Sequence, residues 1–472
     1  MITNEFKNKK ILVAGVGKFP RGSLNSAIRF FVRAGAKVTV TDAKPAPALK
    51  DGLKHLKGLR VAYHLGKLVK KDFENADLVI KAQGNREQAP FLGAASKAGV
   101  HVTTDVGLFM LFAPDLPTIG ITGTRGKSTT TALAGAMIKA DGWAEFVGGN
   151  MKVSPLNFLK DAWRDYDAGK RAAVVLELSS WLLEGWENEG ISPSVAVVTN
   201  IFPDHLNTYP SYAAYARAKA EIFLSQSADD SVVLNRDNLE TKKMSKLAKG
   251  KVYWFSKRPF VGRGACVKNK TIVFKDKKRE AVAKLSDIKY LSGAHNLENV
   301  LAAVAAAKLV GVRNSSIRRT LRSFRGLPDR QELIRARAGV RYVDDTTATS
   351  PDGAVAALRT FGGARKKIIL IAGGKDKALD FKEMAREIKK YAKGLVLFEG
   401  TATDKLIKEL KRAGYKPDLA PVVKDMSTAV KIAADVAARG DIVLLSPGAA
   451  SFGLFKNEFD RGGQFKKAVA KL

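Results

Sequence analysis

A short glycine loop between a predicted strand and a predicted helix constrains this chain more than any other feature. The segment ITGTRGKSTT follows a β-branched run and opens a helical stretch. Gly123 and Gly126 allow backbone N–H groups to point into the loop, and the helix N-terminus adds partial positive charge. Lys127 can reach outer phosphates, and Ser128 or Thr129 can offer a hydroxyl to Mg²⁺. The segment predicts a phosphate-binding loop at the end of a parallel strand.

The glycine spacing of this segment differs from that of the commonest phosphate loop. The pattern G-x-x-x-x-G-K-[ST] requires a glycine where this chain has Ile121, and the chain has Gly123 instead. An ordinary glycine turn before a helix does not also need the Lys-Ser-Thr-Thr run. We therefore interpret the segment as a compact variant of a phosphate loop.

Short β-rich runs alternate with amphipathic helical stretches along the chain, which is typical of parallel sheets covered by helices. A chain of 472 residues exceeds one hydrophobic core and indicates about three domains. We expect an α/β protein with a Rossmann-like N-terminal domain over residues 1–115. Residues 116–325 are expected to form a P-loop ATPase-type parallel sheet with helices on both faces, and residues 326–472 a second Rossmann-like domain.

The first block begins with the buried run KILVAGVG and reaches the strand KVTVTD, which ends at Asp42. An acidic residue at the end of the second strand of a dinucleotide-type fold can bind a ribose or a base. The turn GVGKFPRG does not match G-x-G-x-x-G, however, so an ordinary strand, turn and helix explains the block equally well.

The charge balance raises the question of an anionic partner, since 80 Lys and Arg against 46 Asp and Glu give a formal net charge of +34. The basic residues are spread along the chain, and the densest segment, Lys268 to Glu280, reads as a solvated hairpin. We therefore expect attraction of anionic small substrates and no nucleic-acid partner. We find no apolar run that could span a bilayer and no leader, so we expect a cytoplasmic protein without membrane contact. The single Cys266 leads us to expect no internal disulfide.

Three residues beyond the loop carry side chains that suit metal chemistry. Glu177 is the last residue of a buried strand, where an isolated carboxylate is costly unless a cation pairs with it. A cap between the strand end and the helix that starts near Ser179 explains a glutamate at this position equally well. His205 also follows a strand end, but a lone histidine is usually structural. Lys219 shares a predicted helix face with Tyr215, and a lysine on such an apolar stripe usually extends to solvent. The residues alone leave both interpretations open.

The loop and the motifs after it resemble those of the Mur ligase family, which builds the peptide of bacterial cell-wall precursors. The motifs come in the family's order: GTRGKSTTT, VGGNMKVSPL, LELSSWLLE, TNIFPDHLNTY, YARAKAEIF, SGAHNLENVLAA, FRGLPDRQE, DDTTATSPDGAVAAL, GGKDKALDF and LLSPGAASFGLFKNEFDRGGQF. The resemblance covers nearly the whole chain, and the last four motifs are similar to those of members that add D-glutamate. It implies an ATP-dependent amide ligase that joins D-glutamate to UDP-N-acetylmuramoyl-L-alanine through an acyl phosphate in peptidoglycan precursor synthesis.

The resemblance also implies site residues. It assigns catalysis to Lys127, Glu177, His205 and Lys219. It assigns the binding of two Mg²⁺ ions to Ser128, Glu177, His205 and Lys219, the last after CO₂ has carbamylated its amine. The residues implied to bind ATP are Gly123, Thr124, Gly126, Lys127, Ser128, Thr129, Asn296, Asn299, Arg330 and Asp345. The residues implied to bind the other two substrates are Asp42, Asn150, Ser179, Thr349, Lys377, Ser451 and Phe459. Because Arg330 and Asp345 belong to the third domain, we expect domain closure to complete the site.

Several residues depart from the family's pattern. Thr347 stands where a lysine is usual, Asp329 where a histidine is usual and Leu182 where a glutamine is common. KAQGN replaces a Ser-Pro-Gly loop, and either Glu458 or Phe459 takes an aromatic position near the glutamate pocket. Two alternatives therefore stay open, a relative that adds another amino acid and, from a different class, a nucleic-acid-binding P-loop ATPase. We expect a monomer that acts on small molecules.

Overall fold

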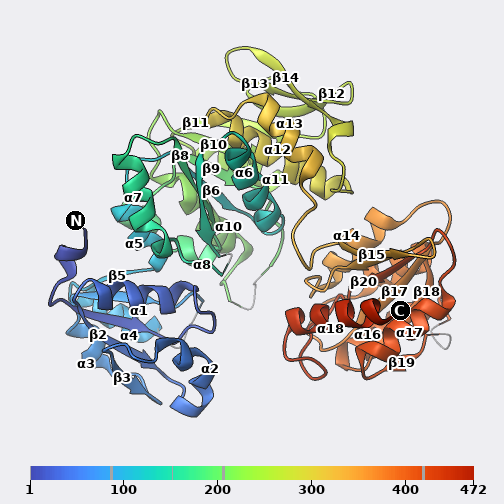
Figure 1. Cartoon of the computed structure of the whole chain (residues 1–472), viewed down its shortest axis with the longest axis horizontal. Coiled ribbons are helices and arrows are strands. Elements are labelled where there is room, and N and C mark those ends of the chain that lie inside the picture. The colour runs from blue at the N-terminus through green and yellow to red at the C-terminus, as the bar shows by residue number, and fades with distance from the viewer. Residues whose placement is uncertain (1, 85–88, 151, 205–207, 417–419) are drawn as a thin grey trace. The chain divides into compact units, whose positions relative to one another are not determined.

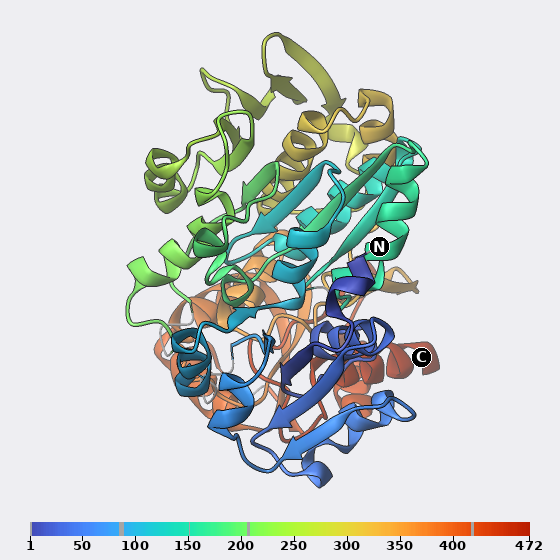
Figure 2. The ribbon, with the colours of Figure 1, turned by 90° about the vertical axis from the view of Figure 1, so that its left-hand side faces the viewer.

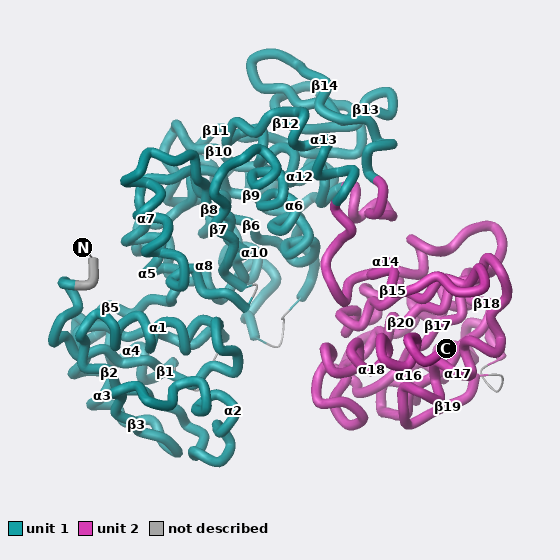
Figure 3. Tube along the Cα trace, viewed as in Figure 1, with its two compact units in different colours: residues 1–288, 298–323 teal, residues 289–297, 324–472 magenta. Residues whose placement is uncertain are grey.

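The structure is a computed structural model and describes residues 2–84, 89–150, 152–204, 208–416 and 420–472. Three β-sheets, each built from its own stretch of the chain, are flanked by helices (Figure 1 and Figure 2). The chain divides into two compact units, residues 1–288 with 298–323 and residues 289–297 with 324–472 (Figure 3). The N-terminal and central sheets belong to the first unit and the C-terminal sheet to the second. The expected α/β class with three sheet domains is confirmed.

The N-terminal sheet has five parallel strands in the order β3-β2-β1-β4-β5. The order reverses between β1 and β4, and the carboxyl edge at such a reversal is where doubly wound sheets bind ligands. The Rossmann-like expectation for this domain is confirmed. Its strands and helices are β1 (Lys10–Ala14), α1 (Ser23–Arg33), β2 (Lys37–Asp42), α2 (Lys50–Leu53), β3 (Ala62–Leu65), α3 (Lys70–Glu74), β4 (Leu78–Lys81), α4 (Ala89–Lys97), β5 (His101–Thr103) and α5 (Asp105–Phe112).

The central sheet has nine strands in the order β14-β13-β12-β11-β10-β9-β6-β8-β7. Its elements are β6 (Thr118–Thr122), α6 (Lys127–Ala140), β7 (Ala144–Gly149), α7 (Leu159–Asp167), β8 (Ala172–Glu177), α8 (Ser180–Leu183), α9 (Trp186–Glu189), β9 (Val195–Val198), α10 (Tyr212–Leu224), β10 (Ser231–Asn235), α11 (Leu239–Met244), β11 (Lys251–Ser256), β12 (Gly264–Lys268), β13 (Thr271–Lys275), β14 (Arg279–Lys284), α12 (Ala294–Leu309) and α13 (Asn314–Ser323). Strands β6, β8 and β9 are buried along their whole length, as expected for the middle of a helix-covered parallel sheet.

The central sheet is parallel from β7 to β12 and then turns antiparallel through β13 and β14. The expectation of a parallel sheet therefore holds for its middle but not for this edge. Asn269 and Lys270 join β12 to β13 with φ values of +50° and +56°. Two left-handed residues make the tight turn that fits the twist of an antiparallel hairpin, so the predicted basic hairpin is present here.

The C-terminal sheet has six strands in the order β15-β16-β20-β17-β18-β19, and only β15 runs antiparallel to its neighbour. Its elements are β15 (Glu332–Arg337), β16 (Val340–Asp344), α14 (Pro351–Phe361), β17 (Ile368–Gly373), α15 (Lys382–Tyr391), β18 (Ala392–Phe398), α16 (Thr401–Arg412), β19 (Val422–Val423), α17 (Met426–Val436), β20 (Ile442–Leu445) and α18 (Glu458–Lys471). Apolar side chains from both faces of this sheet form two buried clusters. Among the described residues of the whole chain, no helix has both the length and the apolar character that crossing a bilayer requires.

Candidate active site

The glycine loop lies at the carboxyl end of β6, where the chain turns into α6. Gly123 has a φ of +141° and Gly126 a φ of +85°, a backbone region that side chains other than glycine rarely adopt. A Cβ at Gly123 would lie 2.0 Å from Thr199 Oγ1, and a Cβ at Gly126 would lie 2.1 Å from Asn299 Oδ1. Backbone conformation and packing therefore both require glycine at these two positions.

The residues that follow β9 support the loop from the neighbouring strand. The N–H of Thr124 donates to Asn200 O at 2.8 Å, and the N–H of Arg125 donates to Asn200 Oδ1 at 2.9 Å. Thr199 Oγ1 donates to Arg125 O at 2.6 Å. Neither Thr199 nor Asn200 is among the site residues predicted from the sequence. In the sequence they follow the buried strand VAVV, which pairs with β6, and they begin the motif TNIFPDHLNTY.

Lys127 begins α6, and its side chain folds back over the loop. Its Nζ donates to Gly123 O at 2.8 Å and to Thr124 O at 3.2 Å. Ser128 and Thr129 follow on the first helical turn and are half-buried. The N-cap residue, Gly126, has no side chain to cap this helix. An ammonium, two hydroxyls and first-turn N–H groups together suit a phosphate chain.

Glu177 ends β8 beside the loop, in register with Ile121 of β6. The residue is 3% exposed, and its Oε1 accepts a hydrogen bond of 2.9 Å from Asn150 Nδ2. Its Oε2 is also buried and has no hydrogen-bond partner among the described residues. A buried carboxylate oxygen without a partner is costly, and a bound cation removes that cost. The carboxylate therefore fits a divalent metal ion, and Asn150 orients it.

Lys219 lies on α10 with an exposed fraction of 2%. Burial, helped by the positive charge of Lys127, holds the pKa of its ammonium well below the usual value, while the charges of Asp204 and Glu177 act in the opposite direction. Its Nζ lies 4.9 Å from the centroid of the Tyr215 ring. The predicted helix face is confirmed, and the lysine on it is buried instead of extending to solvent.

Helix α10 is also tied directly to the loop. The hydroxyls of Tyr215 and Thr124 share a hydrogen bond of 3.1 Å. The phosphate loop, the end of β8 and the middle of α10 thus gather Lys127, Glu177 and Lys219 at one edge of the sheet. The third predicted metal ligand, His205, lies outside the described residues.

The asparagines predicted on α12 have different surroundings. Asn299 is buried, and its Oδ1 lies against Gly126 of the loop, where a Cβ would collide with it. Asn296 Nδ2 donates to Ser292 O at 2.8 Å, a contact at the start of its own helix. The structure therefore brings Asn299 to the loop and gives Asn296 a local partner.

Two predicted substrate residues of the first unit have local hydrogen bonds. The carboxylate of Asp42 accepts from the N–H groups of Val16 at 3.1 Å and Lys44 at 3.0 Å, so it links two loops at the carboxyl edge of the N-terminal sheet. Ser179 accepts from the N–H of Leu182 at 3.3 Å and caps α8. Leu182, where the family commonly has glutamine, is fully buried in the core.

The second unit brings together two of the residues predicted for the amino acid. Lys377 Nζ donates to Thr349 Oγ1 at 3.2 Å, and the lysine is an exposed residue. Ser451 is buried, and its hydroxyl has no hydrogen-bond partner among the described residues. Phe459 is half-buried on the first turn of α18, where its N–H donates to Asn457 Oδ1 at 3.0 Å.

Arg330 and Asp345, predicted to contact ATP, are neighbours in the second unit. Asp345 Oδ1 accepts from the N–H of Gln331 at 3.3 Å, and its Oδ2 accepts from Ser446 Oγ at 2.7 Å. Burial raises the pKa of Asp345 to about 7, against the lowering effect of the Arg330 charge. Arg330 itself is exposed and forms no ion pair with a described residue.

The arrangement of a glycine loop, a helix N-terminus and a buried carboxylate on the adjacent strand defines a P-loop nucleotide-binding enzyme. Comparison with known families gives three matches in chain order. The Mur ligase MurD-like N-terminal domain matches residues 9–104, the Mur ligase middle domain residues 121–307, and the Mur ligase glutamate ligase domain residues 329–448. The chain belongs to the Mur ligase family.

Similar proteins match along nearly their whole length. The UDP-N-acetylmuramoylalanine–D-glutamate ligase of Roseiflexus sp. (strain RS-1) is 39% identical over 98% of this chain and 99% of its own. The enzyme of the same name from Acetivibrio thermocellus is 37% identical over 99% of this chain and 97% of its own. Among solved structures, UDP-N-acetylmuramate-alanine ligase from Thermotoga maritima has a TM-score of 0.60 at 18% identity, over 98% of this chain and 100% of its own. The MurF ligase from the same organism, in complex with ADP, has a TM-score of 0.58 at 17% identity, over 99% and 97%.

Proposed function

We propose that this chain is an ATP-dependent ligase that joins D-glutamate to UDP-N-acetylmuramoyl-L-alanine in peptidoglycan precursor synthesis. The observation that carries the proposal is the buried Oε2 of Glu177, for which the described part of the chain offers no hydrogen-bond partner. It lies beside a phosphate loop whose Lys127 and Ser128 are on the adjoining helix turn. Full-length relatives that carry the D-glutamate ligase name support the choice of substrate.

The chemistry requires activation because a carboxylate carries negative charge and its oxygen is a poor leaving group. A carboxylate oxygen of the alanyl end attacks the γ-phosphorus of ATP, the bond from that phosphorus to the β,γ-bridging oxygen breaks, and ADP leaves. The amine of D-glutamate then attacks the acyl carbon, loses a proton, and expels inorganic phosphate. The protein's part is to position the reactants and to neutralise charge, which Lys127 and the first turn of α6 do at the phosphates.

The buried Oε2 of Glu177, which has no hydrogen-bond partner among the described residues, supports a divalent cation here, and two Mg²⁺ ions, when bound, would neutralise charge on the phosphates during transfer. The ligands would be Ser128, Glu177, His205 and a carbamylated Lys219. Carbamylation joins the neutral amine of Lys219 to CO₂ and releases a proton, so a depressed pKa favours it. The product is an anion in place of a cation, next to Lys127.

We assign the remaining predicted residues to the same reaction. Adenine and phosphate contacts would come from Asn296, Asn299, Arg330 and Asp345, and the UDP-sugar would contact Asp42, Asn150 and Ser179. D-Glutamate would contact Thr349, Lys377, Ser451 and Phe459, and the contact between Lys377 Nζ and Thr349 Oγ1 supports a shared pocket. The domain limits 1–115, 116–325 and 326–472 belong to this proposal, as do a cytoplasmic monomer and small-molecule substrates without a nucleic-acid partner.

The test is phosphate release by the purified protein with ATP, Mg²⁺ and UDP-N-acetylmuramoyl-L-alanine, comparing D-glutamate with L-glutamate, lysine and alanine. Release that depends on D-glutamate supports the proposal, and release with another amino acid alone identifies a different Mur-type ligase. Release that DNA or RNA stimulates without any amino acid would point to the nucleic-acid ATPase instead. Lys127→Ala should abolish turnover, whereas Lys139→Ala on the exposed side of the same helix should preserve it.

A further inference from the structure

A strained loop in the second unit carries Arg330. Asp329 has a φ of +64° and Gln331 a φ of +48°, so two residues in the left-handed region flank the arginine. Residues other than glycine stay in that region only where neighbouring contacts hold them. Thr347 Oγ1 donates to Asp329 O at 2.9 Å, and the Gln331 N–H donates to a carboxylate oxygen of Asp345. The conformation at Arg330 therefore depends on the groups around it.

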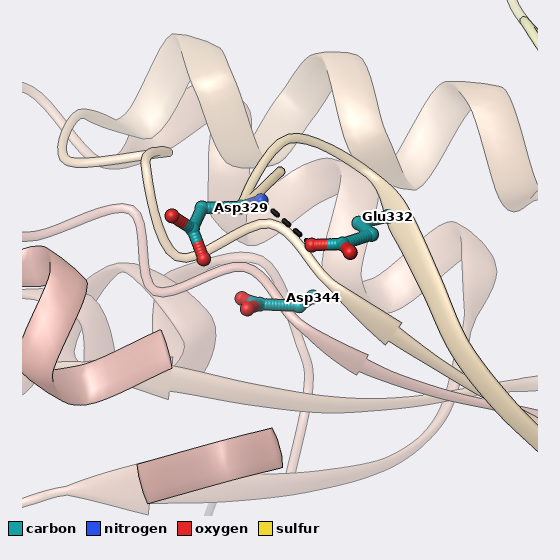
Figure 4. Close-up of side chains that lie close together, drawn as sticks. All are labelled: Asp329, Glu332 and Asp344. Atoms are coloured by element: carbon teal, nitrogen blue, oxygen red, sulfur yellow. Dashed lines mark hydrogen bonds between the residues drawn. The ribbon is translucent and has the colours of Figure 1, made fainter. Parts of the chain in front are cut away.

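Three carboxylates meet beside this loop, as Figure 4 shows for Asp329, Glu332 and Asp344. One ligand oxygen from each lies within 4.8 Å of the others. Asp344 is fully buried, its Oδ2 has no hydrogen-bond partner among the described residues, and burial raises its pKa to about 7. Such a group of acids has the spacing of a metal site, and its negative charge needs a cation.

An ammonium group from α18 supplies that cation. Lys466 Nζ lies 2.9 Å from Asp329 Oδ1, 2.8 Å from Glu332 Oε2 and 3.9 Å from Asp344 Oδ2. Glu332 Oε2 also accepts the N–H of Asp329 at 2.9 Å, so the lysine and this carboxylate hold the loop at both its side chain and its backbone. The three acids are therefore an internal partner for Lys466.

We propose that Lys466 is a positioning residue for ATP binding, acting through Arg330. The inference rests on the proposed function, in which Arg330 contacts ATP. With Lys466 in place, the carboxylates beside the loop have a cation and Arg330 stays exposed. Without it, the carboxylates of Asp329 and Glu332 have no cation, so the loop shifts and no longer holds Arg330 toward the nucleotide. Asp329 also loses the ion pair at its side chain, and Glu332, which accepts the Asp329 N–H, loses its own ion pair with Lys466.

Steady-state kinetics of three single variants test this proposal. Lys466→Met should raise the KM for ATP by about tenfold or more, the order seen when a group supporting a ligand contact is removed, with smaller changes in kcat and in the KM for the UDP-sugar. Lys466→Arg keeps the charge and should stay near wild type. Lys467→Met removes the same charge from the exposed next position of α18 and serves as the matched control.

A double variant covers the case in which Lys466→Met does not fold. Glu332→Gln with Lys466→Met removes one charge of each sign, so it leaves no additional net charge in the cluster, and it should still raise the KM for ATP because Asp329 has lost its anchor. A wild-type KM for ATP in Lys466→Met or in the double variant would overturn the proposal. The proposal would also be wrong if Lys466→Met lowered kcat and raised the KM values for ATP and for the UDP-sugar by the same factor, and if Lys466→Arg behaved in the same way. That result would indicate a purely structural role for Lys466. A wild-type protein that ligates no amino acid would instead overturn the proposed function and this inference with it.

Discussion

Replacing Lys219 by methionine should make the protein more stable and inactive at once. The side chain is 2% exposed, and burial holds the pKa of its ammonium well below the usual value. An unfolded lysine has a pKa of about 10.4, so folding at neutral pH either removes a proton from Lys219 or buries its charge. Methionine has a similar length and fills the same space without that penalty.

The sign of the effect follows from proton counting. Between the depressed folded pKa and about 10.4, the unfolded state binds one proton more at this position than the folded state, so stability rises with pH by about 1.4 kcal/mol per unit. Below the folded pKa both states are protonated, and the full penalty remains. The Lys219→Met variant lacks this contribution at every pH. Its stability advantage should therefore be largest at low pH and shrink as the pH approaches 10.

Urea unfolding at several pH values between 6 and about 10, in CO₂-free buffer, measures the difference between the two proteins. Lys160→Met, at an exposed position of α7, is the matched control and should follow wild type. Ligase activity should disappear in Lys219→Met because no carbamate can form. Parallel pH dependences for wild type and Lys219→Met, or retained activity, would refute the reasoning.

Three further predictions concern the phosphate loop with its neighbouring carboxylate and the residues proposed for D-glutamate. Glu177→Gln keeps the shape but removes the charge, so it should raise the Mg²⁺ concentration needed for phosphate release and lower the rate by about a hundredfold; an unchanged Mg²⁺ titration would contradict this. Gly126→Ala should lower both stability and ATP affinity, since its φ of +85° alone costs a side chain about 1 to 2 kcal/mol and its Cβ would meet Asn299; thermal melts with and without ATP measure both. Thr349→Ala and Lys377→Met should each raise the KM for D-glutamate but not for ATP. Because their side chains are 3.2 Å apart, the double variant should lose less than the two single losses combined, and strict additivity would argue against a shared pocket.

The features that the sequence predicted are those set by local chemistry. The phosphate-binding loop could be predicted because its two glycines and the lysine follow one another within a few residues. The apolar residues around Lys219 recur every three or four positions, which predicts a helix, and α10 spans the predicted stretch from Tyr212. The burial of Glu177 followed from its place at the end of an apolar strand.

The contacts that the sequence could not predict depend on which distant segments become neighbours. Thr199 and Asn200 support the loop only because β9 pairs with β6, a register that no local pattern specifies. Lys466 lies more than a hundred residues from Asp329, and the sequence marked Asp329 only as a departure from a family pattern. The sequence predicted a hairpin at Asn269, but not that its antiparallel strands join the edge of the central sheet.

Oxygen transfer tests the central claim most directly. UDP-N-acetylmuramoyl-L-alanine labelled with ¹⁸O in its terminal carboxylate is incubated with ATP, Mg²⁺, D-glutamate and the purified protein, and the released phosphate is analysed by mass spectrometry. An acyl phosphate predicts one ¹⁸O atom in the phosphate for each amide formed. Phosphate without label, released while the amide forms, would contradict activation of the carboxylate by phosphoryl transfer.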